Sequence, residues 1–288
     1  MADIWLLFVI GTILCYGTAQ QFSKKGVQYI GSYQTGILYA VASIGIQFTY
    51  WLLLPDNVQN NPYGILLSFV AGFIGAMGFV FYIFALKSGK VSVVSVLTAG
   101  YPAVSVLLAI ILLSETLTTG ESAGIVLVVL AIILLSFPSA SEKQKDGASP
   151  KSKRWLMWAI LSLVFWGIWA IPSKLAMIEI GSSDYILIDG LTMVLVWVPL
   201  WLIIDKGRMN REPRKLAYSG TAGILASVGT VSLFLAISIG EVAIVTPLSS
   251  IYPIFTVLLA RFFLKEKLGW IQYAAIGAGV VGILLLAL

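Results

Sequence analysis

Apolar residues occur in runs of about 20 along the whole chain, separated by short polar stretches. A helical run of this length crosses the hydrocarbon core of a bilayer, so each run predicts one membrane-spanning helix. The pattern therefore predicts an all-α polytopic membrane protein with ten transmembrane helices. The predicted spans are approximately 3–23, 34–54, 63–86, 91–113, 119–137, 154–175, 184–204, 215–238, 242–264 and 269–288.

Two longer polar stretches interrupt this pattern. Residues 139–153 are rich in Lys, Ser and Pro, and residues 205–215 contain five Lys and Arg. The first stretch is expected to be a linker between two domains, residues 1–138 and 154–288, because five predicted spans lie on each side of it.

The two halves of the chain resemble each other. Residues 5–32 match 155–182 at an offset of 150, and residues 85–137 match 236–288 at an offset of 151. Apolar helices share Leu and Val by chance, so the polar and conformationally special matches carry the inference. These matches are Gly17 with Gly167, Lys24 with Lys174, Tyr101-Pro102 with Tyr252-Pro253, and Glu115 with Glu266.

A unit with five spans ends on the opposite side of the membrane from where it begins. The second copy therefore enters the membrane from the other side, which predicts two inverted five-helix repeats. The connection at 56–62 has no Lys or Arg, whereas its counterpart at 205–215 has five. Because cytoplasmic loops gather positive charge, this distribution predicts a cell (plasma or inner) membrane protein with both termini outside.

The composition agrees with a membrane protein and excludes several functions. The chain is 59% hydrophobic and 11% charged, whereas soluble domains contain roughly a quarter charged residues. The basic residues lie between the spans, which is unlike a nucleic-acid-binding surface. Histidine is absent and Cys15 is the single cysteine, which removes His-based catalytic triads and most zinc sites. No cofactor or metal is expected, and the chain is expected not to be an enzyme.

A set of short motifs occurs once in each half. The first half contains Tyr16-Gly17…Lys24, Gly89-Lys90-Val91, Tyr101-Pro102 and Leu113-Ser-Glu115-Thr-Leu117. The second contains Trp166-Gly167…Lys174, Gly240-Glu241-Val242, Tyr252-Pro253 and Leu264-Lys-Glu266-Lys-Leu268. Together these motifs resemble the EamA family of the drug/metabolite transporter superfamily. The resemblance implies a ten-helix secondary transporter with a cavity between inverted halves, often an exporter of amino acids, metabolites or drugs.

Two features depart from that superfamily. Its members usually keep both termini in the cytoplasm, whereas the charges here favour the outside. Related small multidrug exporters carry a carboxylate three residues before the glycine of the first span, and Leu14 and Val164 occupy those places here. Proton-driven export of organic cations on that plan is therefore disfavoured.

Lys24 and Lys174 each end an otherwise apolar helix at equivalent places. Charged residues inside a membrane segment usually face a cavity, which predicts a pair that attracts a carboxylate or phosphate of the substrate. The alternative is that both side chains extend to the lipid headgroups.

Pro102 and Pro253 are expected to kink their helices, because proline removes a backbone hydrogen bond and clashes with the preceding turn. Nearby hydroxyl groups, including those of Thr98 and Ser249, are expected to satisfy the freed backbone groups. The kinked helices are predicted to line the cavity, so Tyr101 and Tyr252 are candidate substrate-binding residues. A static kink that only aids packing is the alternative.

Other polar and aromatic residues complete the candidate site. Asp189 lies inside an apolar run, so it is a candidate for ion coupling, with a salt bridge or a position near the membrane surface as alternatives. Glu115 and Glu266 are expected to cap or start the helices that follow them, with a role in coupling as the alternative. The remaining candidate substrate-binding residues are Tyr16, Gln20, Tyr82, Trp166 and Trp169.

These observations predict a secondary transporter that moves a small metabolite, such as an amino acid or an organic anion, by alternating access between the inverted repeats. Export is the expected direction. Its expected partners are a small-molecule substrate and the lipid bilayer, without nucleic acid, and the chain is expected to act as a monomer. The alternatives are a flippase for a lipid-linked headgroup and a non-transporting membrane subunit.

Overall fold

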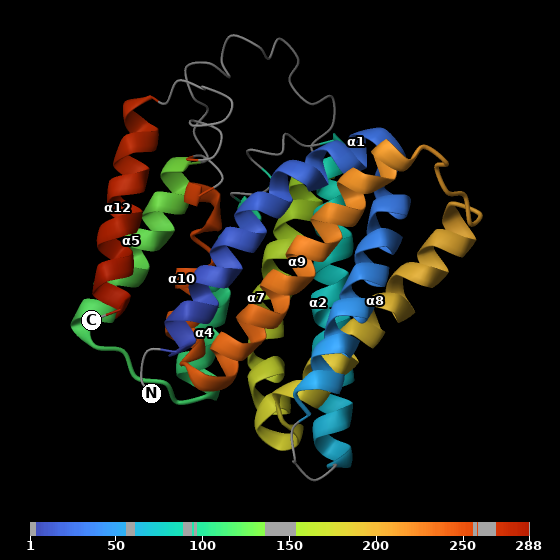
Figure 1. The fold of residues 1–288 in the computed structure, drawn as a ribbon. Coiled ribbons are helices and arrows are strands. Elements are labelled where there is room, and N and C mark those ends of the chain that lie inside the picture. Colours follow the sequence, from blue (N-terminus) through green and yellow to red (C-terminus); the bar gives the residue numbers. More distant parts are fainter. Residues whose placement is uncertain are drawn as a thin grey trace.

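The computed structural model describes residues 4–55, 61–88, 94, 97–135, 154–255, 258 and 269–287. The described residues form helices joined by turns and short loops, without a strand among them (Figure 1). The helices are α1 (Ile4–Leu53), α2 (Pro62–Ser88), α4 (Pro102–Leu112), α5 (Thr119–Leu135), α7 (Arg154–Ile180), α8 (Ser182–Ile204), α9 (Pro213–Ile239), α10 (Val242–Ser249) and α12 (Trp270–Ala287). The predicted linker 139–153, Lys90 and Glu266 lie outside the described residues.

Helices α1, α2, α7, α8 and α9 are each long and apolar enough to cross a membrane. Among the described residues, α4, α5, α10 and α12 are shorter apolar helices. The predicted all-α class is therefore confirmed for the described residues, and these helices agree with the predicted multi-pass membrane protein.

Helix α1 contains two of the predicted spans, joined at a sharp bend. The bend lies at Gly31, whose φ of 82° and ψ of 173° are not helical. After the bend, the second part of α1 turns back along the molecule (Figure 1). Gly181, which separates α7 from α8, has nearly the same conformation, with φ 85° and ψ 162°. Glycine adopts positive φ without a Cβ clash, so the same turn recurs 150 residues apart.

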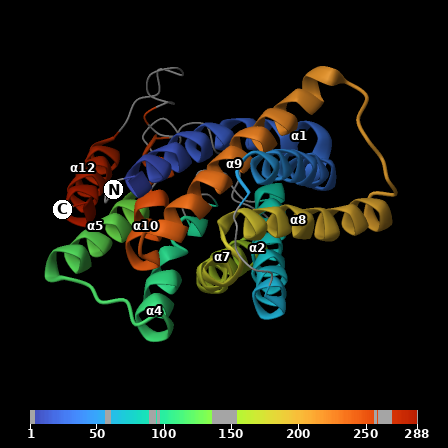
Figure 2. The ribbon, with the colours of Figure 1, turned by 60° about the horizontal axis from the view of Figure 1, so that its bottom comes forward.

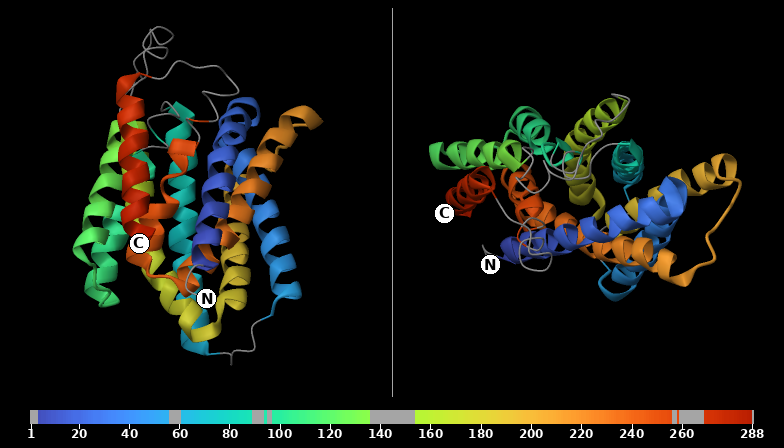
Figure 3. Two further views of the ribbon diagram at one scale, coloured as in Figure 1. Left: turned by 60° about the vertical axis from the view of Figure 1, so that its left-hand side comes forward. Right: turned by 90° about the horizontal axis from the view of Figure 1, so that it is seen from above.

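The helices pack in matched pairs. Helix α1 packs against α9 and α2 packs against α7, while α4 contacts α10 and α5 contacts α12. The α5 and α12 pair lies at one end of the molecule, and α8 and α9 extend toward the other end (Figures 2 and 3). Each of these pairs joins a helix from the first half of the chain to a helix from the second.

Two glycines allow the halves to approach closely. A Cβ on Gly17 would lie 3.1 Å from the carbonyl oxygen of Tyr252, and a Cβ on Gly167 would lie 3.0 Å from the carbonyl oxygen of Tyr101. Small residues are typical where membrane helices pack closely, because the backbones come into contact. In each contact a glycine of one half approaches a tyrosine carbonyl of the other half, and the two contacts use equivalent residues.

Each Tyr-Pro pair lies at an interruption of its helix. Helix α4 begins at Pro102 after a turn at 99–101, and α10 ends at Ser249 before a turn at 250–251. Backbone hydrogen bonds in these turns span three residues, for example from Tyr101 N to Thr98 O at 3.2 Å. The predicted kinks are therefore short breaks, since proline has no N–H to continue the helical pattern.

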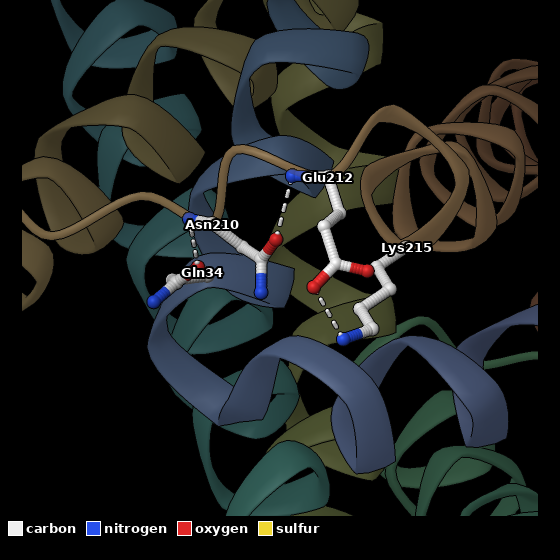
Figure 4. Close-up of polar contacts among 4 residues, drawn as sticks. All are labelled: Gln34, Asn210, Glu212 and Lys215. Atoms are coloured by element: carbon white, nitrogen blue, oxygen red, sulfur yellow. Dashed lines mark hydrogen bonds and ion pairs between the residues drawn. The ribbon is translucent and has the colours of Figure 1, made fainter.

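The basic loop between α8 and α9 is fixed against α1 (Figure 4). The backbone N–H of Asn210 donates to the side-chain oxygen of Gln34 at 2.7 Å. The side chain of Asn210 accepts the N–H of Glu212 at 2.8 Å, and Glu212 forms a 2.7 Å ion pair with Lys215. This loop lies at the upper right of Figure 1, whereas both chain ends lie in the lower half of the view.

Candidate functional site

A cavity of about 150 Å³ lies between α1, α2, α7, α8, α9 and the two Tyr-Pro segments. Both parts of α1 contribute to it, one on each side of the bend at Gly31. The lining residues are Tyr16, Ala19, Gln20, Tyr39, Ser43, Gly75, Phe79, Tyr82, Tyr101, Trp166, Trp169, Asp189, Met193, Ala226, Ser227, Thr230, Leu233, Phe234 and Tyr252.

The lining residues come from equivalent positions of the two halves. Of these 19 residues, 16 form eight pairs at offsets of 150 or 151. The pairs are Tyr16/Trp166, Ala19/Trp169, Tyr39/Asp189, Ser43/Met193, Gly75/Ala226, Phe79/Thr230, Tyr82/Leu233 and Tyr101/Tyr252. Equivalent positions of the two halves therefore line the wall, but the two side chains differ in seven of the eight pairs.

Seven of the eleven predicted substrate-binding residues line the cavity, as does Asp189. The seven are Tyr16, Gln20, Tyr82, Tyr101, Trp166, Trp169 and Tyr252. Thr98 and Ser249 lie behind the wall: the Thr98 hydroxyl donates to the carbonyl oxygen of Val94 at 2.9 Å, and that of Ser249 to Thr246 at 3.0 Å. Both hydroxyl groups thus bond backbone carbonyls near the helix breaks, and that of Ser249 also pairs with the hydroxyl of Tyr101.

The tyrosine hydroxyl groups of the wall are engaged within the protein. The pairs are Tyr16 with Thr230 at 2.9 Å, Tyr82 with Gln20 at 2.5 Å, Tyr101 with Ser249 at 3.3 Å, and Tyr39 with Ser23. A buried tyrosine hydroxyl usually finds such a partner, which leaves the ring as the surface that contacts a ligand. The wall is therefore largely aromatic in character.

Asp189 is an acidic residue of this wall. Its side chain is 7% exposed, and its Oδ2 accepts a hydrogen bond from the amide nitrogen of Gln47 at 3.0 Å. Gln47 is fully buried behind it, on the second part of α1. Among the described lining residues Asp189 is the one carboxylate, and none is a lysine or an arginine.

Lys174 belongs to α7, and its side chain lies away from the cavity, against the C-terminal end of α9. Its ammonium group donates to the carbonyl oxygens of Ile237, Ser238 and Gly240 at 2.7, 3.2 and 3.0 Å. The last carbonyls of a helix have no partner within the helix, and a cation there is also favoured by the helix dipole. Lys24, the equivalent residue, is exposed on α1. Neither lysine lines the cavity, in contrast with the expected anion-binding pair, because carbonyl groups already hold Lys174.

Glu115 binds the start of α10, which follows the end of α9. Its two carboxylate oxygens accept the backbone N–H groups of Val242 at 3.0 Å and Ala243 at 2.8 Å. Glu115 thus caps α10, from the other half of the chain, instead of the following helix as expected. Burial and the carboxylates of Glu115 and Glu121 raise the pKa of the neighbouring Glu241, while the Lys174 ammonium lowers it. The hydrogen bonds of Lys174 and Glu115 thus satisfy carbonyl groups at the end of α9 and N–H groups at the start of α10.

Several cavity residues were not predicted from the sequence. Tyr39, Phe79, Thr230 and Phe234 line the wall, but each is an ordinary residue for a membrane helix. The repeat could have identified one of them. Tyr39 lies 150 residues before Asp189, which was a candidate site residue because of its charge. Residues at equivalent places of the two halves line the same cavity, so the offset alone points to Tyr39.

A comparison with known families decides the assignment. The model of the EamA-like transporter family matches this chain twice, over residues 3–137 and 153–288. The chain belongs to the EamA-like transporter family. This is a family of transporters rather than of enzymes, which agrees with the resemblance carried by the Tyr-Pro and Leu-x-Glu-x-Leu motifs.

Relatives of this EamA-family chain include other transporters. An uncharacterised transporter of Archaeoglobus fulgidus is 23% identical, over 98% of both chains. An uncharacterised protein of Methanocaldococcus jannaschii is 30% identical over 45% of this chain and 93% of its own length. A crystal structure of a protein with 16% identity has a TM-score of 0.75 and covers 97% of this chain and 94% of its own, which shows a shared fold.

Proposed function

We propose that this chain is a secondary transporter that moves a small solute by alternating access between two inverted five-helix repeats, within a ten-helix architecture. The observation that carries the proposal is the composition of the cavity wall. Equivalent positions of the two halves supply 16 of its 19 lining residues. A site at the interface of two repeats is where rocking of one repeat against the other exposes a bound solute to each side in turn.

The repeat itself is supported by independent features. The same positive-φ glycine turn recurs at Gly31 and Gly181, and the family model matches each half. The close contacts of Gly17 and Gly167 are made with equivalent partners in the opposite half. One chain supplies both sides of the cavity, which supports a monomer as the transporting unit.

The proposed orientation places both termini outside the cell. The basic loop 205–215 lies toward the opposite end of the molecule from the chain ends (Figure 1). Because positive loops stay in the cytoplasm, this arrangement supports the orientation inferred from charge. Export is the direction that the family resemblance favours. We do not propose an organic anion as the solute, because the described cavity wall contains no lysine or arginine to pair with it.

Solute flux in liposomes tests the proposal. The purified chain would be reconstituted into liposomes and assayed with labelled amines, amino acids, sugars and organic acids. Ala226→Leu, which adds volume inside the wall, should abolish flux, whereas Ala274→Leu at an exposed site on α12 should not. Absence of flux for every solute, or equal flux in the two variants, would refute transport through this cavity.

A further inference from the structure

We propose that the solute of this cavity is a small organic cation, either a protonated amine or a quaternary ammonium compound; this inference rests on the transport function proposed above. The first support is the charge of the wall. Among the described lining residues Asp189 is the one carboxylate, with no lysine or arginine beside it, and the chain has no histidine. A bound carboxylate or phosphate would face Asp189 without a positive partner, which is strongly unfavourable in a buried site.

The two lysines that were predicted to bind substrate do not change this balance. The ammonium group of Lys174 is held by three carbonyl oxygens at the end of α9, and Lys24 is exposed. Moving Lys174 into the cavity would break three charge-assisted hydrogen bonds. The positive charge that compensates Asp189 is therefore expected to come from the solute.

Asp189 retains hydrogen-bonding capacity. Within the part of the chain that the structure describes, Gln47 is the one side chain that donates to its carboxylate. An ionised carboxylate has about four acceptor sites on its two oxygens, so one donor leaves most of them unused. A buried carboxylate is stabilised when a cation pairs with it, and an ammonium group within the cavity supplies that pairing.

The aromatic rings suit the same chemistry. Trp166 lies 5.5 Å from Tyr82 and 6.4 Å from Tyr101, measured between ring centroids, and Tyr16 lies 5.8 Å from Tyr252. The face of an aromatic ring attracts cations, and several rings around one site recognise ammonium groups. The hydroxyl groups of Tyr16, Tyr82 and Tyr101 are bonded within the protein, so the wall is poorly suited to a sugar, which needs many donors and acceptors.

The cavity volume limits the size of the cation. At about 150 Å³ the cavity is smaller than the roughly 300–1,000 Å³ of pockets for drug-sized ligands. An engineered apolar cavity of about 150 Å³ binds benzene. The volume therefore favours a compact cation of the size of tetramethylammonium or choline over a large drug.

Binding to the purified full-length protein in lipid nanodiscs tests the charge requirement. Isothermal titration would compare choline with 3,3-dimethylbutan-1-ol, its uncharged carbon isostere, and with glycine betaine, which adds a carboxylate to the same head group. Choline should bind at least about tenfold more tightly than either compound. The alcohol has no positive charge to pair with Asp189, and the carboxylate of betaine is repelled by it. Equal binding of either compound, or no binding of both choline and tetramethylammonium, would overturn the inference.

Two variants on α8 test the role of Asp189. Asp189→Asn should weaken choline binding at least about tenfold, because the amide no longer compensates a cation. Asp184→Asn is the matched control, since Asp184 bonds Trp51 at 2.7 Å and does not line the cavity. Melting curves without ligand would verify that both variants fold. Unchanged choline affinity in folded Asp189→Asn would overturn the assignment.

Flux and binding separate this inference from the proposed transport function. Charge-selective choline binding without choline flux into liposomes would refute transport and leave the cation site standing. Flux of betaine or an organic acid, without binding of any tested cation, would overturn the cation site and leave transport standing.

Discussion

Replacing Lys174 with Met provides a direct test of the capping role assigned to this residue. The substitution keeps an unbranched apolar side chain but removes the ammonium group and its bonds to the carbonyl oxygens of Ile237, Ser238 and Gly240. Because the lost interactions are structural, the expected result is a less stable protein. Lys24→Met is the matched control, since Lys24 occupies the equivalent place in the first half and is exposed.

The magnitude follows from the contacts of Lys174. Hydrogen bonds from a charged group contribute about 1.5–3 kcal/mol to stability, and a cation at a helix C-terminus adds about 0.3–1 kcal/mol. Lys174 is half-buried, so part of this gain is offset by its desolvation, and a loss of about 2 kcal/mol is expected. At roughly 2–4 °C per kcal/mol, the melting temperature should fall by about 4–8 °C. The exposed Lys24→Met substitution should change stability by less than about 0.5 kcal/mol.

The measurement is a thermal scan of tryptophan fluorescence in one detergent at a fixed scan rate, because membrane proteins commonly unfold irreversibly. Choline binding to Lys174→Met below its melting temperature should match the unmodified protein. A normal melting temperature with a specific loss of solute binding or flux would refute the capping role and return Lys174 to the substrate site.

Three further predictions concern packing, capping and orientation. Gly167→Ala should lower the melting temperature, because the added Cβ would lie 3.0 Å from the carbonyl oxygen of Tyr101. Gly45→Ala is the control and should be neutral or stabilising, since no atom lies within 4 Å of its Cβ. The same thermal scan measures both variants. Glu115→Ala should cost about 1–2 kcal/mol by removing the cap of α10, and an unchanged melting temperature would contradict that. In a Cys15→Ser background, Leu288→Cys should react with an impermeant maleimide in intact cells; labelling only after permeabilisation would reverse the orientation.

The hydrophobic pattern predicted the fold class because spans and loops in a membrane protein differ in their solvent. Polar backbone groups within lipid must be satisfied internally, which favours helices, and the described parts of the long apolar runs are mainly helical apart from the breaks near the Tyr-Pro pairs. The same pattern did not predict the details of the breaks. The bend at Gly31 falls between two predicted spans, and the two helical parts of α1 meet there at one residue with non-helical φ and ψ. A bend of this kind depends on the backbone conformation of a single glycine, which hydropathy does not report.

The residues of the candidate site were predicted where they were unusual for a membrane helix. Tyr16, Trp166 and the tyrosines of the two Tyr-Pro pairs, Tyr101 and Tyr252, stood out by their polarity and repetition, and they line the cavity. Lys174 also stood out, but for a different reason. A lysine at the end of an apolar helix is compatible with a substrate, with lipid headgroups or with the end of another helix. The contact with α9 depends on tertiary packing between segments 63 to 66 residues apart in sequence.

Duplication explains the frame of the cavity, and divergence within the equivalent pairs explains its chemistry. Tyr39 and Asp189 occupy equivalent places in the wall, but only one of them carries a carboxylate. A carboxylate at both places would put two like charges in one small cavity, and each would oppose ionisation of the other. A tyrosine at both places would leave no charge to select a cation over its uncharged isostere. One acid and one aromatic ring at these equivalent places fit a solute with a single positive charge, so under the proposed cation site the asymmetry of the repeat, more than its symmetry, would set what the cavity selects.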